Sequence, residues 1–176
     1  KKQNYWKLNE FIDNKKFSEG QFKSLLTNAI EIRQEADVPV ANFLSGGLDS
    51  TYIIKNLSKS SRKINTYSIG FDNPAYDETH WQQKVVDNYK TNHMYEKIGS
   101  NLDIETIFDS IKAFDEPYSD PSSIPSFVIS KNISKEYKVA ISGDGGDELF
   151  GGYTRLVDAF KSNKKADLSF LYKFYP

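Results

Sequence analysis

Cysteine is absent from the 176 residues of this sequence, and histidine and methionine are scarce, with two and one residues respectively. Without cysteine, these residues form no disulfide, no thiolate metal site and no cysteine nucleophile. The two histidines, His80 and His93, lack the spacing of metal ligands, and we interpret both as structural or surface residues. The sequence therefore excludes a disulfide-stabilised scaffold and a thiolate enzyme.

Long apolar runs and an excess of charge of one sign are also missing. No stretch approaches the roughly 20 apolar residues that cross a membrane, and none has the form of a signal peptide. Lysine and arginine number 23 against 24 acidic residues, which gives a net charge of −1 and no reason to expect a general nucleic-acid binder. With 38% hydrophobic residues, the chain can bury a core. We expect a cytoplasmic globular protein with no membrane or nucleic-acid partner.

Short apolar runs alternate with longer amphipathic ones along most of the chain. The pattern predicts strands over residues 38–44, 64–71, 93–98 and 138–142. It predicts helices after Ser18 and over residues 49–57, 77–89, 104–111 and 122–136. This alternation is typical of the α/β class, with a parallel sheet covered by helices on both faces. In such sheets, ligands bind at the carboxyl ends of the strands, where the strand order reverses.

Two of these helices carry predictions about single residues. Ser18 and Gln21 form a capping-box pattern at the start of the first helix. Asp77 is the expected N-cap of the helix over residues 77–89. The helical spacing predicts that the inward face of that helix consists of Trp81, Val85 and Tyr89.

The segment Ser45–Thr51, S-G-G-L-D-S-T, joins the first predicted strand to its helix. Its two glycines let the backbone turn sharply and approach a ligand, and its main-chain amides can bind an anion together with the helix N-terminus. It is not a Walker A loop, because that pattern occurs nowhere in the sequence and no lysine stands where it would reach a β- or γ-phosphate. The segment is a candidate phosphate loop of another type.

A carboxylate, Asp49, stands among these anion-binding groups. A carboxylate beside a phosphate is repulsive unless a cation bridges the two, and hard oxygen ligands with phosphate are typical of Mg²⁺. The alternative is a glycine-rich turn in which Asp49 only favours the start of a helix through the helix dipole.

A second glycine-rich segment, Ser142–Glu148, follows the last predicted strand and reads S-G-D-G-G-D-E. Three carboxylates within five residues repel one another and have little to bury, so the segment is either a solvated loop or a metal and catalytic site. It lacks the alternating spacing of an EF-hand. If both loops lie on one sheet edge, Asp49 and Asp147 face one crevice and can share Mg²⁺. A triphosphate bound there without a Walker lysine indicates cleavage at the α-phosphate, with pyrophosphate leaving.

These motifs resemble a known family. S-G-G-L-D-S resembles the pyrophosphate loop of ATP pyrophosphatases, the PP-loop enzymes with the adenine nucleotide alpha hydrolase-like fold. Three further segments are similar to the asparagine synthetase subgroup, namely residues 71–78, 114–125 and 142–155. The resemblance covers roughly residues 35–160, and several separated motifs in the right order make it specific.

The resemblance implies an ATP- and Mg²⁺-dependent reaction. Such enzymes activate the side-chain carboxylate of aspartate as β-aspartyl-AMP and release pyrophosphate, after which ammonia forms asparagine and AMP. The implied partners are ATP, aspartate, ammonia and, in the full-length chain, a glutaminase domain, with a homodimer left open. The alternatives are a related adenylating enzyme that forms amides (a β-lactam or lasso-peptide cyclase, or a sugar amidotransferase) and a non-catalytic ATP-binding fragment.

Carried over motif by motif, the resemblance implies roles for single residues. The pyrophosphate part of ATP would be held by Ser45, Gly46, Gly47, Asp49 and Ser50. Mg²⁺ would be bound by Asp49 and Asp147. The adenosine would contact Leu44, Ile69, Ser142 and Gly143. The expected catalytic carboxylates are Asp144, Asp49 and Asp147, and Asp144 stands where many relatives carry a glutamate.

The sequence departs from the full enzymes at both ends. Their glutaminase domain has an N-terminal cysteine nucleophile, whereas this sequence starts with Lys1 and contains no cysteine. Their synthetase domain continues beyond the position of Pro176 into helices that supply a lysine near the phosphates. We therefore expect residues 1–176 to be the ATP-binding synthetase domain as a fragment, and its activity alone is left open. Four further residues have either a structural or an active-site interpretation: Glu116, Asp120, Tyr153 and Arg155.

Overall fold

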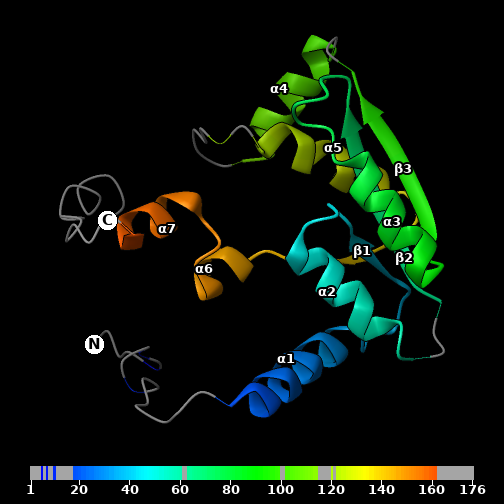
Figure 1. The fold of residues 1–176 in the computed structure, drawn as a ribbon. Coiled ribbons are helices and arrows are strands. Elements are labelled where there is room, and N and C mark those ends of the chain that lie inside the picture. The colour runs from blue at the N-terminus through cyan, green and yellow to red at the C-terminus, as the bar shows by residue number, and fades with distance from the viewer. Residues whose placement is uncertain are drawn as a thin grey trace. The chain divides into compact units, whose positions relative to one another are not determined.

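A computed structural model gives the fold of the chain (Figure 1). It describes residues 5, 7, 10, 18–60, 63–99, 102–114, 120 and 122–161, with the side chains of residues 155, 156, 159 and 160 excepted. The chain divides into two compact units, Lys1–Glu35 and Ala36–Pro176. None of the helices in the described part of the chain is both long and apolar enough to cross a membrane.

The described helix of the first unit is α1, Glu19–Arg33. Its N-cap is Ser18, whose hydroxyl accepts a hydrogen bond from the amide of Gln21 at 3.3 Å, as the sequence predicted. At the other end, Nη1 of Arg33 donates to the carbonyl of Ala29 at 2.7 Å. A cation at this end also complements the helix dipole, so the local sequence accounts for both ends of α1.

The second unit contains a parallel four-stranded sheet, which confirms the predicted α/β class. The strands are β1 (Val40–Phe43), β2 (Asn65–Phe71), β3 (Asn92–Ile98) and β4 (Val139–Ile141). Their order across the sheet is β3-β2-β1-β4. Phe43 lies opposite Tyr67 in the β1–β2 pair, and Asn42 lies opposite Ile141 in the β1–β4 pair. The chain therefore moves outward from β1 through β2 to β3 and then returns to the other side of β1.

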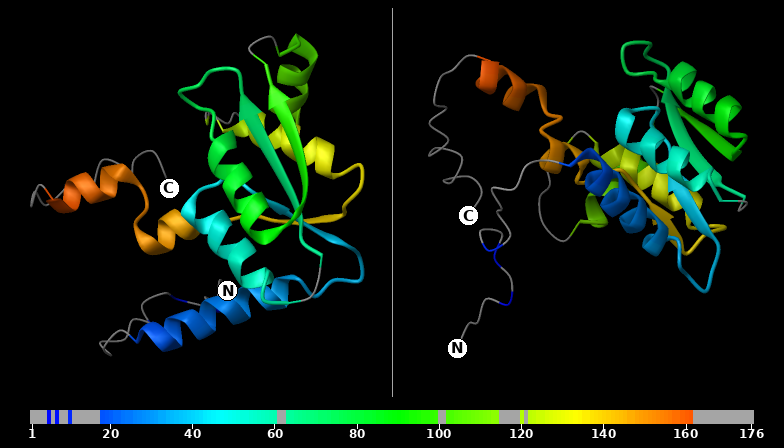
Figure 2. Two further views of the ribbon diagram at one scale, coloured as in Figure 1. Left: turned by 45° about the vertical axis from the view of Figure 1, so that its right-hand side comes forward. Right: turned by 60° about the horizontal axis from the view of Figure 1, so that its bottom comes forward.

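Helices cover both faces of this sheet, as expected (Figure 2). On one face lie α2 (Leu48–Leu57) and α3 (Thr79–Tyr89), and on the other lies α5 (Ser123–Ile133) with α4 (Ile104–Lys112) packed against it. Crossovers between parallel strands are right-handed, so reversing the direction of travel along the sheet moves the connecting helices to the opposite face. Two short helices that the sequence did not predict, α6 (Gly146–Phe150) and α7 (Thr154–Lys161), follow β4.

The face under α5 holds an aromatic core. Ala41, Tyr67 and Ile133 are buried there, and the Tyr67 and Tyr137 rings pack edge to face with centroids 5.6 Å apart. The Tyr67 hydroxyl donates to the Glu136 carboxylate at 3.1 Å. Burial, followed by this hydrogen bond, raises the pKa of Tyr67 to about 12. Tyr67 therefore keeps its proton and ties β2 to the turn that follows α5.

Helix α3 buries a face that agrees only in part with the predicted one, since Val85 is buried and Tyr89 half-buried but Trp81 is exposed. Trp81 is 50% exposed, and its ring lies beside His80 with Lys84 Nζ 4.0 Å from the ring centroid. The buried residues are Val85, as predicted, and Gln82. The prediction was wrong for Trp81 because hydrophobic periodicity counts only apolar residues, whereas the Gln82 amide finds a main-chain acceptor inside the protein.

The N-cap prediction for α3 was also wrong. The helix begins at Thr79 with Glu78 in the N-cap position, and no side chain caps it. The Asp77 carboxylate instead accepts hydrogen bonds from the Thr79 hydroxyl at 2.6 Å and from the amide of Phe71 at 3.2 Å. These bonds lower the pKa of Asp77. Asp77 therefore closes the loop after β2 and does not serve as a helix cap.

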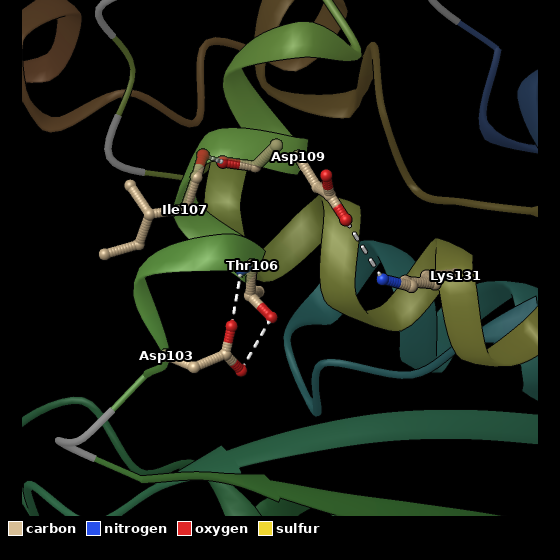
Figure 3. Close-up of polar contacts among 6 residues, drawn as sticks. Asp103, Thr106, Ile107, Asp109 and Lys131 are labelled. Atoms are coloured by element: carbon tan, nitrogen blue, oxygen red, sulfur yellow. Dashed lines mark hydrogen bonds and ion pairs between the residues drawn. The ribbon is translucent and has the colours of Figure 1, made fainter.

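Helix α4 has the aspartate cap that α3 lacks (Figure 3). The Asp103 carboxylate accepts from the amide of Thr106 at 2.6 Å and from its hydroxyl at 3.0 Å, and this lowers the pKa of Asp103. Farther along, Asp109 of α4 faces Lys131 of α5 at 3.5 Å. Local capping thus fixes the start of α4, and an exposed ion pair joins the two helices.

Candidate active site

The carboxyl ends of β1 and β4 lie side by side at the point where the strand order reverses. From β1 the chain passes to α2 on one face of the sheet, and β4 is followed by α6 near the start of α2 (Figures 1 and 2). When the segments that follow two neighbouring strands leave the sheet in different directions, a crevice opens between them. Ligands of α/β proteins bind in such crevices.

The first loop turns sharply at Gly46, which has a φ of +85°. A Cβ at this position would lie 2.8 Å from Cβ of Trp81 and 2.9 Å from the main-chain nitrogen of Gln82. Both the left-handed conformation and the contact with the backbone of α3 require glycine. Gly46 therefore lets the loop pass close beneath α3 before it enters α2.

Two serines hold this loop in shape. The hydroxyls of Ser45 and Ser50 are 3.0 Å apart, Ser45 Oγ accepts from the amide of Gly47 at 3.2 Å, and Ser50 Oγ is 3.2 Å from the carbonyl of Gly47. Ser50 is only 5% exposed. Each serine thus bonds within the loop, and the loop is ordered before any ligand binds.

The start of α2 can receive an anion. Its N-cap is Gly47, and no side chain caps the helix. The amides of the first turn have no acceptor within a helix, and the helix dipole adds partial positive charge there. Leu48, the first residue of the helix, is 89% exposed. This combination favours the binding of a phosphate group.

The second loop packs directly against Asp49 of the first. A Cβ on Gly146 would lie 2.6 Å from Cγ and from Oδ2 of Asp49, and a Cβ on Gly143 would lie 3.0 Å from Asp49 Cβ and 3.3 Å from the amide nitrogen of Ser50. A side chain at position 146 would displace the Asp49 carboxylate, and one at position 143 would press tightly against Asp49. The two loops, far apart in the sequence, therefore meet at one carboxylate.

Hydrogen bonds within the second segment orient the remaining acids. Ser142 Oγ donates to Asp144 Oδ2 at 2.9 Å. The carbonyl of Asp147 accepts from the amides of Gly151 and Gly152 at 2.9 and 3.1 Å, and a Cβ on Gly152 would collide with the Asp147 carboxylate. Glycine at position 152 thus allows the chain to fold back over Asp147.

Both loops line one open cavity of about 540 Å³. Of the predicted site residues, those that line it are Ser45, Gly47, Asp49, Ser50, Ser142, Gly143, Asp144 and Asp147. The other described lining residues are Phe43, Asp120, Ser122, Ser126, Gly145, Glu148 and Tyr153. A cavity of this size is within the range of small-molecule and cofactor sites.

Three predicted residues do not line this cavity: Leu44, Gly46 and Ile69. The Leu44 side chain is 1% exposed, its amide donates to Tyr67 at 2.8 Å, and its carbonyl accepts from the Ser68 hydroxyl. The carbonyl of Ile69 accepts from the side chain of Gln82 at 2.9 Å. These residues shape the ends of β1 and β2 beside the cavity.

Negative charge dominates the described walls of the cavity. They include five carboxylates, from Asp49, Asp120, Asp144, Asp147 and Glu148, and they include no lysine or arginine. Within the described residues there is no group of three or more histidine, cysteine, aspartate or glutamate side chains placed to hold a metal ion. A metal bound here would need ligands from a substrate in addition to the carboxylates, as Mg²⁺ in nucleotide sites commonly does.

Some residues entered the site from outside the two loops. Ser122, the N-cap of α5, and Ser126 lie one turn apart, a spacing that marks one helix face and could have identified Ser126 in the sequence. Asp120 lines the cavity and also accepts from the amide and hydroxyl of Ser122 at 2.8 and 2.7 Å, so both interpretations of this residue stand. The Tyr153 hydroxyl donates to Glu148. Glu116 and the side chain of Arg155 lie outside the described residues.

The fold and the position of the loops define an α/β protein of the PP-loop, adenine nucleotide alpha hydrolase-like class. The structure of an NMN synthetase from Francisella tularensis has a similar fold, with a TM-score of 0.52 and 16% identity over 80% of this chain and 61% of that chain. This likeness confirms the predicted fold class.

Sequence similarity identifies the family. Residues 21–173 match the asparagine synthase family. A candidate glutamine-hydrolysing asparagine synthetase of Methanocaldococcus jannaschii is 39% identical over 163 residues, which cover 89% of this chain and 31% of that protein. Asparagine synthetase 1 of Bacillus subtilis is 29% identical over 133 residues, covering 76% of this chain and 21% of that protein. The chain belongs to the asparagine synthase family, and it spans less than a third of the length of these relatives.

Proposed function

We propose that this chain is the ATP-binding synthetase domain of an enzyme that makes asparagine from aspartate, ATP and ammonia. The observation that carries the proposal is the packing of Gly143 and Gly146 against Asp49, which joins two glycine-rich acidic loops into one cavity. The family of the chain supports the same reaction. In this proposal, a glutaminase domain of the longer protein supplies the ammonia.

The phosphates of ATP bind at the first loop. The turn from Ser45 to Gly47 is held by the bond from the Gly47 amide to Ser45 Oγ, and the uncapped start of α2 that follows presents main-chain amides to the pyrophosphate part. The adenosine binds along the main chain at Leu44 and Ile69 and against Ser142 and Gly143, with the main chain carrying the contact at Leu44 because its side chain is buried. The amides orient the triphosphate and balance part of its charge.

The site fits a Mg²⁺ ion that arrives with the nucleotide. Asp49 and Asp147 belong to the loops that meet, both line the cavity, and carboxylate oxygens with phosphate oxygens are the ligands that Mg²⁺ prefers. When bound, the ion would neutralise charge on the phosphates and favour departure of pyrophosphate. It would also offset the repulsion between phosphate and the acidic walls.

The reaction proceeds in two balanced steps. The side-chain carboxylate of aspartate attacks the α-phosphorus of ATP, and the bond from that phosphorus to the oxygen bridging to the β-phosphate breaks. Pyrophosphate departs, and β-aspartyl-AMP is formed. Ammonia then attacks the β-carbonyl, loses a proton and expels AMP, leaving asparagine. The Asp144 carboxylate, oriented by Ser142, lies in the same cavity and can accept that proton or orient the ammonia.

The test is product analysis with ATP, Mg²⁺, aspartate and ammonia. We expect aspartate-dependent AMP and pyrophosphate from the enzyme that contains this domain, and loss of at least about 100-fold in rate in Asp49→Asn and Asp147→Asn. Asp109→Asn is the matched control, because Asp109 lies outside the cavity in an exposed ion pair. Formation of ADP and phosphate would overturn the proposal. Dependence on a different carboxylate or amine would reassign the acceptor within the family.

A further inference from the structure

A glutamine beside the first loop has no obvious structural reason to be there. Gln82 of α3 is 3% exposed. Its Oε1 is the one fully buried side-chain nitrogen or oxygen without a hydrogen-bond partner among the residues that the structure describes. A buried acceptor without a donor costs free energy of folding, and an apolar residue of similar size would avoid that cost. The burial of a glutamine here must therefore be explained by what its side-chain nitrogen, Nε2, does.

The other half of the amide holds the end of β2. Gln82 Nε2 donates to the carbonyl of Ile69 at 2.9 Å. Along β2, the carbonyl of Tyr67 points to β1, where it accepts from Leu44 at 2.8 Å. Carbonyl directions alternate along a strand, so the Ile69 carbonyl points to the same side, beyond the last residue of β1, Phe43. Gln82 therefore supplies the donor that a continuing β1 would have supplied.

The same residue also contacts the turn that ends β1. The main-chain nitrogen of Gln82 would lie 2.9 Å from a Cβ at Gly46, so the first turn of α3 packs against the phosphate loop. Gln82 is thus in contact with both segments that diverge at this point, the loop at Gly46 and the strand end at Ile69. A carbonyl oxygen accepts two hydrogen bonds, so the carbonyl of the half-buried Ile69 can accept a second donor besides Gln82.

We infer that Gln82 is a positioning residue for the nucleoside: it fixes the main chain at Ile69 so that the end of β2 can receive the base of ATP. This inference rests on the proposed function, because it assumes that ATP binds at the two loops. It assigns Gln82 no contact with the phosphates. Its effect should accordingly be specific for ligands that carry a nucleoside.

The experiment compares two ligands and two matched variants. Gln82→Met removes both polar atoms at nearly constant volume, and Gln83→Met makes the same change at the exposed neighbour, which bonds only to Asp87. Binding of Mg²⁺ with ATP and of Mg²⁺ with pyrophosphate is measured by calorimetry on the wild-type chain and on both variants. Gln82→Leu is the replacement should the first variant fail to fold.

We expect Gln82→Met to weaken ATP binding about threefold to tenfold and to leave pyrophosphate binding within about twofold of wild type. Gln83→Met should bind both ligands as wild type does. The thermal midpoint of Gln82→Met should fall only a little, because losing the unpartnered Oε1 partly offsets leaving the Ile69 carbonyl without its Gln82 donor.

Two results would overturn the inference while leaving the proposed function intact. Unchanged ATP affinity in Gln82→Met would show that the strand end needs no such support. An equal loss for ATP and pyrophosphate would show a general disturbance of the phosphate loop. If the wild-type chain binds pyrophosphate and ATP equally weakly or not at all, the proposed ATP site itself fails, and the inference falls with it.

Discussion

Single atoms decide how closely the two acidic loops can approach each other. At Gly146, a methyl group would stand 2.6 Å from the Asp49 carboxylate. We predict that Gly146→Ala displaces Asp49 and weakens Mg²⁺-dependent ATP binding at least about tenfold, because Asp49 can no longer occupy its place between the loops. Isothermal calorimetry with Mg²⁺ and ATP measures this.

The control for this prediction is Gly20→Ala. Gly20 is the second residue of α1 and has open space around its Cα, so the change should stabilise the helix by no more than about 0.5 kcal/mol. It should leave ATP binding as it is. Equal ATP affinities in Gly146→Ala and wild type would show that the position of Asp49 does not matter for the nucleotide.

His93 makes the stability of the chain depend on pH. Burial lowers the pKa of His93 below its ordinary value of 6.5, and its Nδ1 lies 3.0 Å from the Thr66 hydroxyl. The unfolded chain therefore binds the proton more readily than the folded chain, so stability contributed by neutral His93 is complete above pH 6.5 and is lost as the pH falls below it. Denaturant unfolding between pH 7 and pH 5.5 should show this decline. His93→Gln should show a smaller decline, and His80→Gln, at an exposed position, should follow wild type.

At the scale of elements, α4 provides a test of capping. Asp103→Ala removes the two hydrogen bonds that Asp103 accepts from Thr106 (Figure 3) and should lower the free energy of unfolding. Because the pKa of Asp103 is lowered in the folded state, this contribution is present above its unfolded pKa and is lost as the pH falls through the folded value. Urea unfolding at pH 7 and at pH 3 measures both effects.

Asp109→Ala is the comparison on the same helix. Asp109 pairs with Lys131 at 3.5 Å, and both side chains are about half exposed. An exposed pair contributes about 0.5 kcal/mol or less, so this variant should be clearly more stable than Asp103→Ala. The reverse order of stabilities would contradict the capping argument.

Helices and strands could be predicted from the sequence where local patterns, such as an N-cap or an apolar run, specify them. Ser18 caps α1 as its sequence pattern predicts, and the four strands lie within the predicted ranges or extend them by one residue. The inward face of α3 was not predictable, because the burial of Gln82 depends on a carbonyl of another strand. The short helix α6 begins with Gly146 after a glycine with positive φ, and such residues carry no helix signal.

For the whole molecule, the division into two units predicts which unit bound nucleotide stabilises. Both acidic loops belong to the unit Ala36–Pro176, and α1 belongs to the other. At about 100 times its Kd, ATP should add about 2.7 kcal/mol to the free energy of unfolding of the unit that binds it. Hydrogen exchange with Mg²⁺ and ATP should therefore slow at the amides of β1, α2 and β4, and by less at those of α1. Equal protection of α1 would contradict a site confined to the second unit.

The sequence by itself determined the alternation of strands and helices, the glycines at the ends of β1 and β4, and the acids that follow them, because propensity, capping and chain flexibility are local properties. It also carried the family resemblance. Only the tertiary structure decided that Asp49 would lie against Gly143 and Gly146, that Ser126 would join the cavity, and that a buried amide would bond to β2 at Ile69. These contacts depend on the strand order β3-β2-β1-β4, and strand order is set by the packing of helices on the two faces of the sheet, which no single segment encodes.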